Sequence, residues 1–303
     1  MIRPLYSSQV NLLLTVLSDV TRSPDIALKG GTAINLFLLN MPRLSVDIDL
    51  TYLKILPREE SLKAISKAME EIFQRLVSYP NMKVEKKTTQ EEVPKQILLK
   101  LKNVSIKIEI NHILRGSVYI PVSLTLCDKA KALYAKEIEV QLLSFEDLYA
   151  GKFCAALDRQ HPRDLFDVYY FFQKFEFTEK LKNAFIAYLL STNRPIHEIL
   201  KPSVLDQKEI YVREFESMTD EPISYRQLEE SRLRLIETLN QSLTTKDKDF
   251  LISFEQGEPN WSIFPISHAQ DMPAIKWKLY NIHQMDPEKR KISVMNLQKK
   301  LKF

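Results

Sequence analysis

The sequence predicts an α/β protein of the α+β kind, with a mixed sheet in its first part and a helix-rich region after it. Segments that alternate apolar and polar residues lie before residue 112, and segments with helical spacing surround and follow them. Hydrophobic residues make up 45% of the chain and charged residues 27%, which is typical of a packed globular protein. A length of 303 residues favours two domains rather than one core.

The elements before residue 112 follow from apolar periodicity. Helical spacing predicts helices over 10–20, 33–40 and 61–78. Period-two alternation and short apolar runs predict strands over 26–28, 45–52, 84–87, 96–101 and 105–111. Thr32 stands where it could cap the second helix, because its hydroxyl can accept a hydrogen bond from a free helical N–H.

From Ser144 onward the pattern becomes helical. Ser144 and Asp147 form a capping-box-like start, and further apolar periodicity follows. Helices are expected over 145–157, 164–174, 181–190 and 227–242. Breaks at Pro195 and Pro202 place a boundary near residue 200. We therefore expect domains over 1–200 and 201–303.

Composition narrows the cellular setting. The two cysteines, Cys127 and Cys154, cannot build a disulfide framework. The N-terminus lacks the apolar run of a secretion signal, and no stretch is long and apolar enough to span a membrane. A cytoplasmic protein with no membrane partner is expected.

The net charge of +4 permits a polyanionic partner without requiring one. Basic residues gather at 289–291, at 299–302 and between Lys83 and Lys95. Each cluster alone is more typical of a solvated surface than of a binding site.

Two aspartates on one predicted strand are candidate metal ligands. Asp47 and Asp49 are separated by one residue, so they emerge on the same side with Cα atoms roughly 6.5 to 7 Å apart. This suits a shared pair of hard cations. Glu109, which alternates with isoleucines, is the candidate third carboxylate. An acidic pair on a strand is more often found on a solvated face than at a metal site, so this pattern alone does not identify the function.

The segment Gly30-Gly31-Thr32 lies between a predicted strand and a predicted helix. Such a turn presents free backbone N–H groups, which suit an anion such as a triphosphate. A plain tight turn with Thr32 as a helix cap explains the same residues.

Three blocks of sequence together resemble a known family. K-G-G-T-A at 29–33 followed by R-L-S-V-D-I-D-L at 43–50 resembles the DNA polymerase β-type nucleotidyltransferase motif. G-K-F-C-A-A-L-D-R-Q-H-P-R-D-L-F-D-V at 151–168, and two segments between 250 and 282, are similar to later blocks of the AbiEii/MenT toxin family of abortive-infection and toxin–antitoxin systems. The resemblance implies a polymerase β-like nucleotidyltransferase domain followed by a helical domain.

The resemblance also implies roles for individual residues. Asp47 and Asp49 match the metal-binding pair, with two Mg²⁺ ions expected, and Gly30, Gly31 and Thr32 match the turn that binds the nucleotide phosphates. In the second block, Lys152 matches the lysine that contacts the triphosphate, and Asp164 or Asp167 matches a later functional aspartate. We favour Asp167, because its neighbours suggest a more enclosed position. Thr32 replaces the usual serine, and the segment 33–46 is longer than in minimal members of the superfamily.

The chemistry of the residues agrees with these roles. Arg163 offers a bidentate fork for a phosphate, and Asp164 and Asp167 lie three apart and so share a helix face. A surface network of Arg163 with the two aspartates is the alternative explanation. Glu109 would support the metal at the acceptor and serve as, or position, a base.

The expected reaction moves a nucleoside monophosphate from an NTP to an acceptor hydroxyl. The resemblance adds RNA, particularly tRNA at its 3′ end, as acceptor and a cognate antitoxin as protein partner. Two alternatives stay open: nucleotidylation of a small molecule or a protein, and a catalytically silent binding module or antitoxin-like regulator. The aromatic run 169–175, Trp261 and Trp277 are expected to pack hydrophobic cores.

Overall fold

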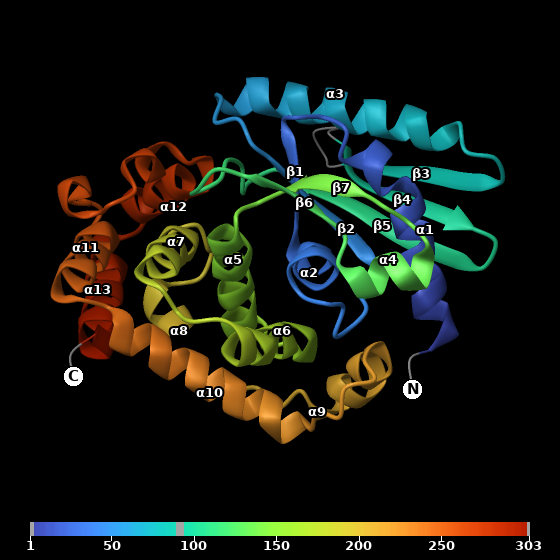
Figure 1. Cartoon of the computed structure of the whole chain (residues 1–303). Coiled ribbons are helices and arrows are strands. Elements are labelled where there is room, and N and C mark those ends of the chain that lie inside the picture. The colour runs from blue at the N-terminus through green and yellow to red at the C-terminus, as the bar shows by residue number, and fades with distance from the viewer. Residues whose placement is uncertain (1–2, 89–93, 302–303) are drawn as a thin grey trace. The chain divides into compact units, whose positions relative to one another are not determined.

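The structure is a computed structural model that describes residues 3–88 and 94–301. The chain divides by its internal contacts into two compact units (Figure 1). Unit 1 contains residues 1–148 and 212–222, and unit 2 contains residues 149–211 and 223–303. This division differs from the boundary expected near residue 200. The domains over 1–200 and 201–303 stay a prediction, because compact units defined by contacts are not the same as independently folding domains.

Unit 1 is built on a mixed seven-stranded sheet in the order β3-β4-β5-β2-β1-β7-β6. β2 runs parallel to β5 and antiparallel to β1. The strands are β1 (Ile26–Lys29), β2 (Asp47–Tyr52), β3 (Met82–Thr88), β4 (Pro94–Leu101), β5 (Val104–Asn111), β6 (Val122–Thr125) and β7 (Glu139–Leu142). The mixed sheet confirms the predicted fold class. β6 and β7 were not predicted from the sequence, because four residues are too few for a period-two pattern to stand out.

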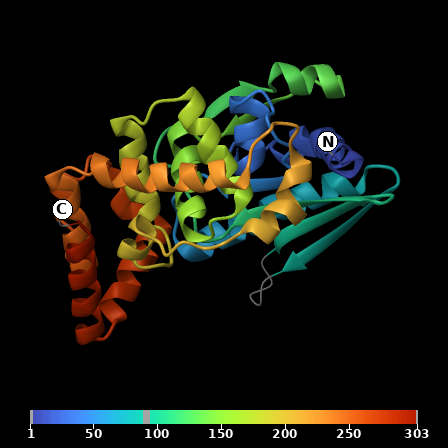
Figure 2. The ribbon, with the colours of Figure 1, turned by 90° about the horizontal axis from the view of Figure 1, so that it is seen from below.

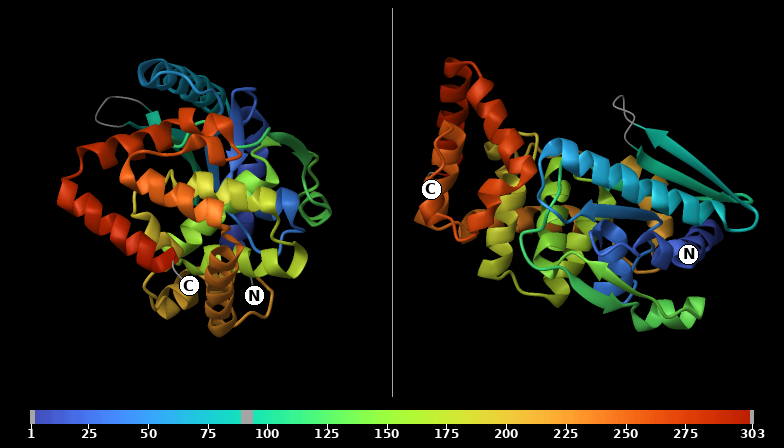
Figure 3. Two further views of the ribbon diagram at one scale, coloured as in Figure 1. Left: turned by 90° about the vertical axis from the view of Figure 1, so that its left-hand side faces the viewer. Right: turned by 90° about the horizontal axis from the view of Figure 1, so that it is seen from above.

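Helices α1 (Pro4–Val20) and α3 (Arg58–Val77) pack against one face of this sheet, and Figure 3 shows α3 lying across the strands. β5 buries Ile106, Ile108 and Ile110 on this side, where α1 contacts it. The polar residues between these isoleucines therefore project from the opposite face. A shorter helix, α4 (Asp128–Tyr134), precedes β7.

The connection from β1 to β2 is helical from its first residue. α2 (Gly30–Ala33) continues directly into a π-helical turn, η1 (Ile34–Leu38). The N-cap residue is Lys29, and no side chain caps the helix. The prediction that Thr32 caps a helix over 33–40 is therefore wrong, since the helix begins two residues earlier at Gly30.

A late segment of the chain belongs to unit 1. Its helical turns are η2 (Tyr211–Phe215) and η3 (Glu216–Met218). The N–H of Leu44 donates to the carbonyl of Met218 at 2.8 Å, and the Thr219 hydroxyl donates to the carbonyl of Pro42 at 2.7 Å. These bonds fix the loop that leads into β2.

Unit 2 is helical, as the sequence predicts for the later part of the chain. Its longest helix, α10, runs alongside α6 (Figure 2). The helices are α5 (Phe145–Asp158, which begins in unit 1), α6 (Pro162–Lys174), α7 (Glu179–Leu189), α8 (Ile196–Leu200), α9 (Lys208–Ile210), α10 (Tyr225–Ser242), α11 (Thr245–Gln256), α12 (Pro273–Gln284) and α13 (Pro287–Leu301). Capping boxes at Ser224 and Thr244 start α10 and α11.

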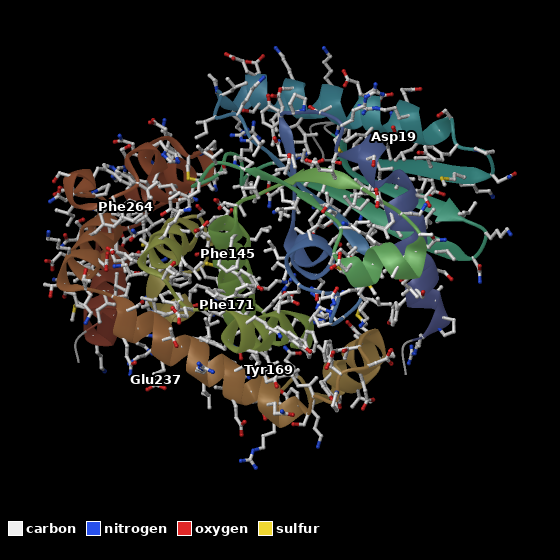
Figure 4. All side chains as sticks on the ribbon, viewed as in Figure 1. Asp19, Phe145, Tyr169, Phe171, Glu237 and Phe264 are labelled. Atoms are coloured by element: carbon white, nitrogen blue, oxygen red, sulfur yellow. The ribbon has the colours of Figure 1, made fainter. Side chains whose placement is uncertain are left out.

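An aromatic cluster forms the core between α5 and α6. The ring of Phe171 lies 5.0 Å from that of Phe153 and 4.9 Å from that of Tyr149. Figure 4 shows Phe171 on the inner side of α6, while Glu237 projects outward from α10. The predicted core role of the aromatic run is confirmed for Phe171, which is fully buried.

In the part of the chain that the structure describes, no helix is both long enough and apolar enough to cross a membrane.

Candidate active site

Four polar residues form a row across the sheet of unit 1. Lys29 of β1 pairs in register with Asp49 of β2, Asp49 pairs with Glu109 of β5, and Glu109 pairs with Gln96 of β4. Residues directly paired on neighbouring strands project from the same face, which Asp47 shares because it lies two residues before Asp49. The structure thus places Glu109 beside Asp49, as the alternation in the sequence suggests. Its catalytic role stays a prediction.

The two glycines after β1 let the backbone approach these side chains closely. Gly30 has a φ of +74°, and a Cβ on it would lie 2.5 Å from Oδ2 of Asp49. A Cβ on Gly31 would lie 2.7 Å from Nη2 of Arg43 and 2.9 Å from Oγ of Ser45. A side chain at either position would displace a polar group of the candidate site, so the turn needs glycine for space as well as for conformation.

Thr32 holds the start of β2 in place. Its hydroxyl lies 2.5 Å from the carbonyl oxygen of Asp47 and 3.1 Å from Oγ of Ser45, and the residue is 1% exposed. Thr32 therefore positions Asp47 through its backbone. Direct contact of Thr32 with a nucleotide stays a prediction.

Lys29 is a residue of this site that was not predicted from the sequence. Burial lowers the pKa of its ammonium group, and the nearby charges of Asp49 and Glu109 oppose that shift. The signal in the sequence was its position at the end of an apolar strand, directly before two glycines. Its partner Asp49 could be recognised only from the antiparallel pairing of β1 with β2.

The carboxylates offer the oxygen ligands that Mg²⁺ prefers, and two of them share one strand face. Glu109 accepts a hydrogen bond from Nε2 of Gln96 at 2.5 Å. Over residues 3–88 and 94–301, no three His, Cys, Asp or Glu side chains are arranged so that they could hold a metal ion. Asp47 and Asp49 supply two such carboxylates on one strand face, Glu109 is engaged by Gln96, and a divalent cation at this place stays a prediction.

A second polar cluster lies within unit 2, between α5 and α6. Nζ of Lys152 lies 2.7 Å from Oδ1 of Asp164 and 2.9 Å from Oδ2 of Asp167. The Lys152 side chain is 7% exposed, and those of Asp164 and Asp167 are 2% and 0% exposed. Both aspartates lie on one helix face, as their spacing predicts, and both are enclosed, so burial does not favour Asp167 over Asp164.

Arg159, which was not predicted as a site residue, completes this cluster. Its Nε and Nη2 atoms lie 2.5 Å and 3.1 Å from the two carboxylate oxygens of Asp164. Burial alone would raise the pKa of Asp164, but the charge of Lys152 and the hydrogen bonds from Arg159 and Lys152 hold it well below its usual range. The surface network of Arg163 with the aspartates is not formed, because its place is taken by Arg159 and the aspartates are buried.

The turn between α5 and α6 is held in place by Arg232 of α10 and by the backbone at Ser203. Gln160 has a φ of +51°, and its side chain accepts a hydrogen bond from Nη1 of Arg232 at 2.9 Å and donates to the carbonyl of Ser203 at 2.7 Å. His161 is the N-cap of α6, and its Nδ1 accepts from the N–H of Arg163. These contacts set the position of Asp164 at the start of α6.

Comparisons with known proteins agree with this architecture. The family model described as nucleotidyl transferase AbiEii toxin of a type IV toxin–antitoxin system matches residues 11–280. The solved structure of MenT4, a nucleotidyltransferase toxin from Mycobacterium tuberculosis H37Rv, is similar with a TM-score of 0.62 and 12% identity, over 92% of this chain and 95% of that chain. No curated protein sequence gives a significant match. The structural likeness shows the fold, and the family match over most of the length shows that the chain belongs to the AbiEii family of nucleotidyltransferase toxins of type IV toxin–antitoxin systems.

Proposed function

We propose that this nucleotidyltransferase moves a nucleoside monophosphate from an NTP to the 3′-hydroxyl of an RNA, with tRNA as the acceptor. The observation that carries the proposal is the row of Lys29, Asp49 and Glu109 on one sheet face, with Asp47 beside it and the two-glycine turn against Asp49. The acceptor oxygen forms a bond to the α-phosphorus while the bond from that phosphorus to the bridging oxygen breaks. Pyrophosphate leaves with that oxygen, and the hydroxyl proton passes to Glu109 or to a water that Glu109 positions.

Asp47 and Asp49 would hold the divalent cations of the reaction. Two Mg²⁺ ions bound there would lower the pKa of the acceptor hydroxyl and neutralise charge on the triphosphate. Gly30 and Gly31 offer backbone N–H groups to the phosphates beside the carboxylates. Lys29 supplies a positive charge at the same place, next to Asp49.

In unit 2, we assign Lys152 to the triphosphate, as the family resemblance implies. Asp164 and Asp167 hold its ammonium group in a fixed position, because their carboxylate oxygens lie 2.7 Å and 2.9 Å from Nζ. Arg163 forms no ion pair within residues 3–88 and 94–301, so its guanidinium is available for a phosphate.

The choice of a polyanionic acceptor rests on the lysines that share the carboxylate face of the sheet. Lys107 pairs in register with Asp47, and Lys87 extends the row beyond Gln96. Both side chains are exposed. A nucleic-acid backbone that contacts these lysines would bring its end to the carboxylates. The protein partner we propose is a cognate antitoxin, and the place of action is the cytoplasm, where tRNA and NTPs occur together.

The acceptor can be identified by label transfer. Purified protein is incubated with Mg²⁺, total RNA and each α-labelled NTP in turn, and RNA from cells that make the protein is sequenced at its 3′ ends. We expect label in RNA of tRNA length and added 3′ nucleotides that prevent aminoacylation. The Asp47→Asn variant serves as control and should leave the RNA ends unchanged. Label on protein or on small molecules alone, with unaltered RNA ends, would rule out RNA as acceptor.

The proposed contact of Lys87 and Lys107 with RNA predicts how RNA affinity depends on salt concentration. Lys87→Ser and Lys107→Ser should each weaken RNA binding several-fold and reduce the slope of log K against log salt by about 1, because each lysine neutralises about one phosphate. The matched control is Lys67→Ser, an exposed lysine of α3 on the opposite side of the sheet. The proposed RNA path is wrong if the three variants lose affinity equally. Binding is measured by filter retention or anisotropy at four or more salt concentrations.

Glu109→Gln should lower the single-turnover rate by about 100-fold and leave NTP affinity within about twofold, because general-base assistance contributes on the order of 10²–10⁴-fold. The amide keeps the size of the side chain but cannot take up a proton. Glu85→Gln, an exposed glutamate of β3 paired with Lys100, is the control. An unchanged single-turnover rate for Glu109→Gln would remove Glu109 from the reaction.

A further inference from the structure

Residues 212–222, which we call the return loop, belong to unit 1, although the residues on both sides of them belong to unit 2. The base of the loop is closed within unit 2. The hydroxyl of Tyr211 donates to the carbonyl of Ile223 at 2.6 Å, and the rings of Tyr211 and Tyr225 lie 5.7 Å apart. A loop whose ends are close and whose own side chains are packed is an Ω-loop, a type that is frequently functional.

Buried side chains fix the return loop in unit 1. Phe215 is 0% exposed and Met218 is 2% exposed. Removal of two such side chains from water stabilises the loop in one position. The N–H of Arg3 adds a hydrogen bond to the carbonyl of Ser217 at 3.2 Å. The return loop is therefore a packed element rather than a slack connection.

The return loop holds the segment that leads into β2 through two hydrogen bonds. The N–H of Leu44 donates to the carbonyl of Met218, and the hydroxyl of Thr219 donates to the carbonyl of Pro42 at 2.7 Å. Thr219 is 5% exposed, and its oxygen accepts from the N–H of Glu221 at 3.0 Å. The donor of this hydroxyl thus serves the segment before β2, and its acceptor serves its own loop.

The held segment depends on such support because its backbone is not relaxed. Met41 has a φ of +50°, in the left-handed region that residues with a side chain rarely adopt. A conformation of this kind persists only where the surrounding contacts fix it. Residues 41–45 are buried, so a carbonyl here that loses its donor is left unsatisfied rather than hydrated.

The segment ends at the first candidate metal ligand. Asp47 is the first residue of β2 and follows Leu44 by three positions. On its other side, the hydroxyl of Thr32 bonds to the carbonyl of Asp47 and lies 3.1 Å from Oγ of Ser45. The chain that enters β2 is therefore held at two places, by Thr32 and by the return loop. Reactive groups must be placed to within a fraction of an ångström, so both supports bear on the carboxylates.

We propose that Thr219 is a positioning residue for Asp47 and Asp49. Its bond to the carbonyl of Pro42 fixes the segment before β2 and thereby sets where the two carboxylates lie. The inference deepens the proposed function and rests on it for the role of the carboxylates as ligands of divalent cations.

Binding of Mn²⁺ without NTP or RNA tests this role, because free Mn²⁺ is measured directly by its electron paramagnetic resonance signal. Thr219→Val keeps nearly the same shape and removes the hydroxyl. We expect it to weaken Mn²⁺ binding about tenfold, and Thr219→Ser to restore binding to within about twofold, as for the loss and return of one buried hydrogen bond. The matched control is Thr21→Val, which removes another buried hydroxyl of unit 1, bonded to the carbonyl of Leu17 at 2.8 Å.

The dependence of transfer on Mg²⁺ separates positioning from stability. At limiting Mg²⁺, Thr219→Val should transfer about tenfold more slowly than the wild type, and saturating Mg²⁺ should restore most of the rate. Thr21→Val should show no such dependence. The fold is checked by circular dichroism, because both tryptophans lie in unit 2 and do not report on unit 1. Trp261 packs 5.3 Å from Phe250, whereas Trp277 is 51% exposed, so the prediction that Trp277 packs a core is wrong.

Hydrogen exchange of the wild-type protein tests the same coupling without any change in the return loop. If the bond from Thr219 favours cation binding, a bound cation must favour that bond by the same factor. Saturating Mn²⁺ should therefore slow amide exchange in peptides that cover 42–47 and 213–219 by up to about tenfold. The Asp47→Asn variant should show no such slowing.

The outcomes distinguish this inference from the proposed function. Wild-type Mn²⁺ affinity in Thr219→Val would overturn the positioning role and leave the carboxylates as the cation site. If that variant does not fold, exchange at 213–219 that Mn²⁺ does not change would overturn it equally. Equal Mn²⁺ binding by the wild type and Asp47→Asn would instead overturn the metal assignment of the proposed function, and with it the role of Thr219.

Discussion

Asp47→Asn and Asp49→Asn are each expected to lower NTP-dependent transfer by about a thousandfold or more, while the protein stays folded. Each substitution removes one negative charge that would bind the catalytic cations, and such an interaction supplies several kcal/mol to the transition state. The fold should tolerate the change because both side chains are only half-buried and the amide has nearly the same size. The bond from Thr32 to position 47 uses the backbone carbonyl, which the substitution keeps.

The Asp49 variant should show a second effect. Asp49 is one of the two charges that oppose the loss of the proton from half-buried Lys29. Its removal leaves Glu109 alone in that role, so Lys29 should become easier to deprotonate.

The control for both variants is Asp25→Asn, which removes a half-buried aspartate of unit 1 that pairs with Lys54 at 2.7 Å and lies outside the candidate site. Circular dichroism and thermal unfolding check the fold, and initial rates are measured across a range of Mg²⁺ concentrations. Retention of a tenth of the normal rate by either variant in saturating Mg²⁺ would refute the metal assignment.

The carboxylate row could be anticipated from the sequence because it depends on local periodicity. Asp47, Asp49 and Glu109 lie on strands whose alternation fixes which side each residue faces, whichever strands are neighbours. Lys29 and Gln96 were missed because their place depends on strand pairing, and a shift of one residue in register would move each to the other face. Similarly, β6 and β7 follow from pairing in the sheet rather than from any pattern in their four residues.

In unit 2 the sequence predicted the helices better than the contacts between them. The three-residue spacing of Asp164 and Asp167 correctly places both on one face of α6. The alternative explanation paired the aspartates with Arg163, which is adjacent in sequence, whereas the structure shows Arg159, which follows α5, bound to Asp164. The reason is the turn at Gln160, whose left-handed conformation and bonds to Arg232 and Ser203 depend on segments far along the chain.

Lys152→Met is expected to lower the free energy of unfolding by about 3–5 kcal/mol and to abolish transfer. Removal of one partner of a buried ion pair leaves an uncompensated charge, and here two carboxylates, Asp164 and Asp167, lose the same ammonium group. The full effect should be seen at pH 7. Since the pKa of Asp164 is held below its unfolded value of about 3.9, its contribution to stability is complete above that pH and is lost as the pH falls toward the folded pKa.

A triple variant, Lys152→Met with Asp164→Asn and Asp167→Asn, separates stability from catalysis. With all three charges removed, no unpaired buried charge is left, so urea unfolding at pH 7 should show most of the lost stability restored. Transfer should nevertheless stay at background, because the cation that we assign to the triphosphate is missing. A triple variant with near-normal kcat/KM for the NTP would show instead that Lys152 serves only to neutralise the two aspartates, and that the triphosphate is bound by other cations such as Lys29 and Arg163.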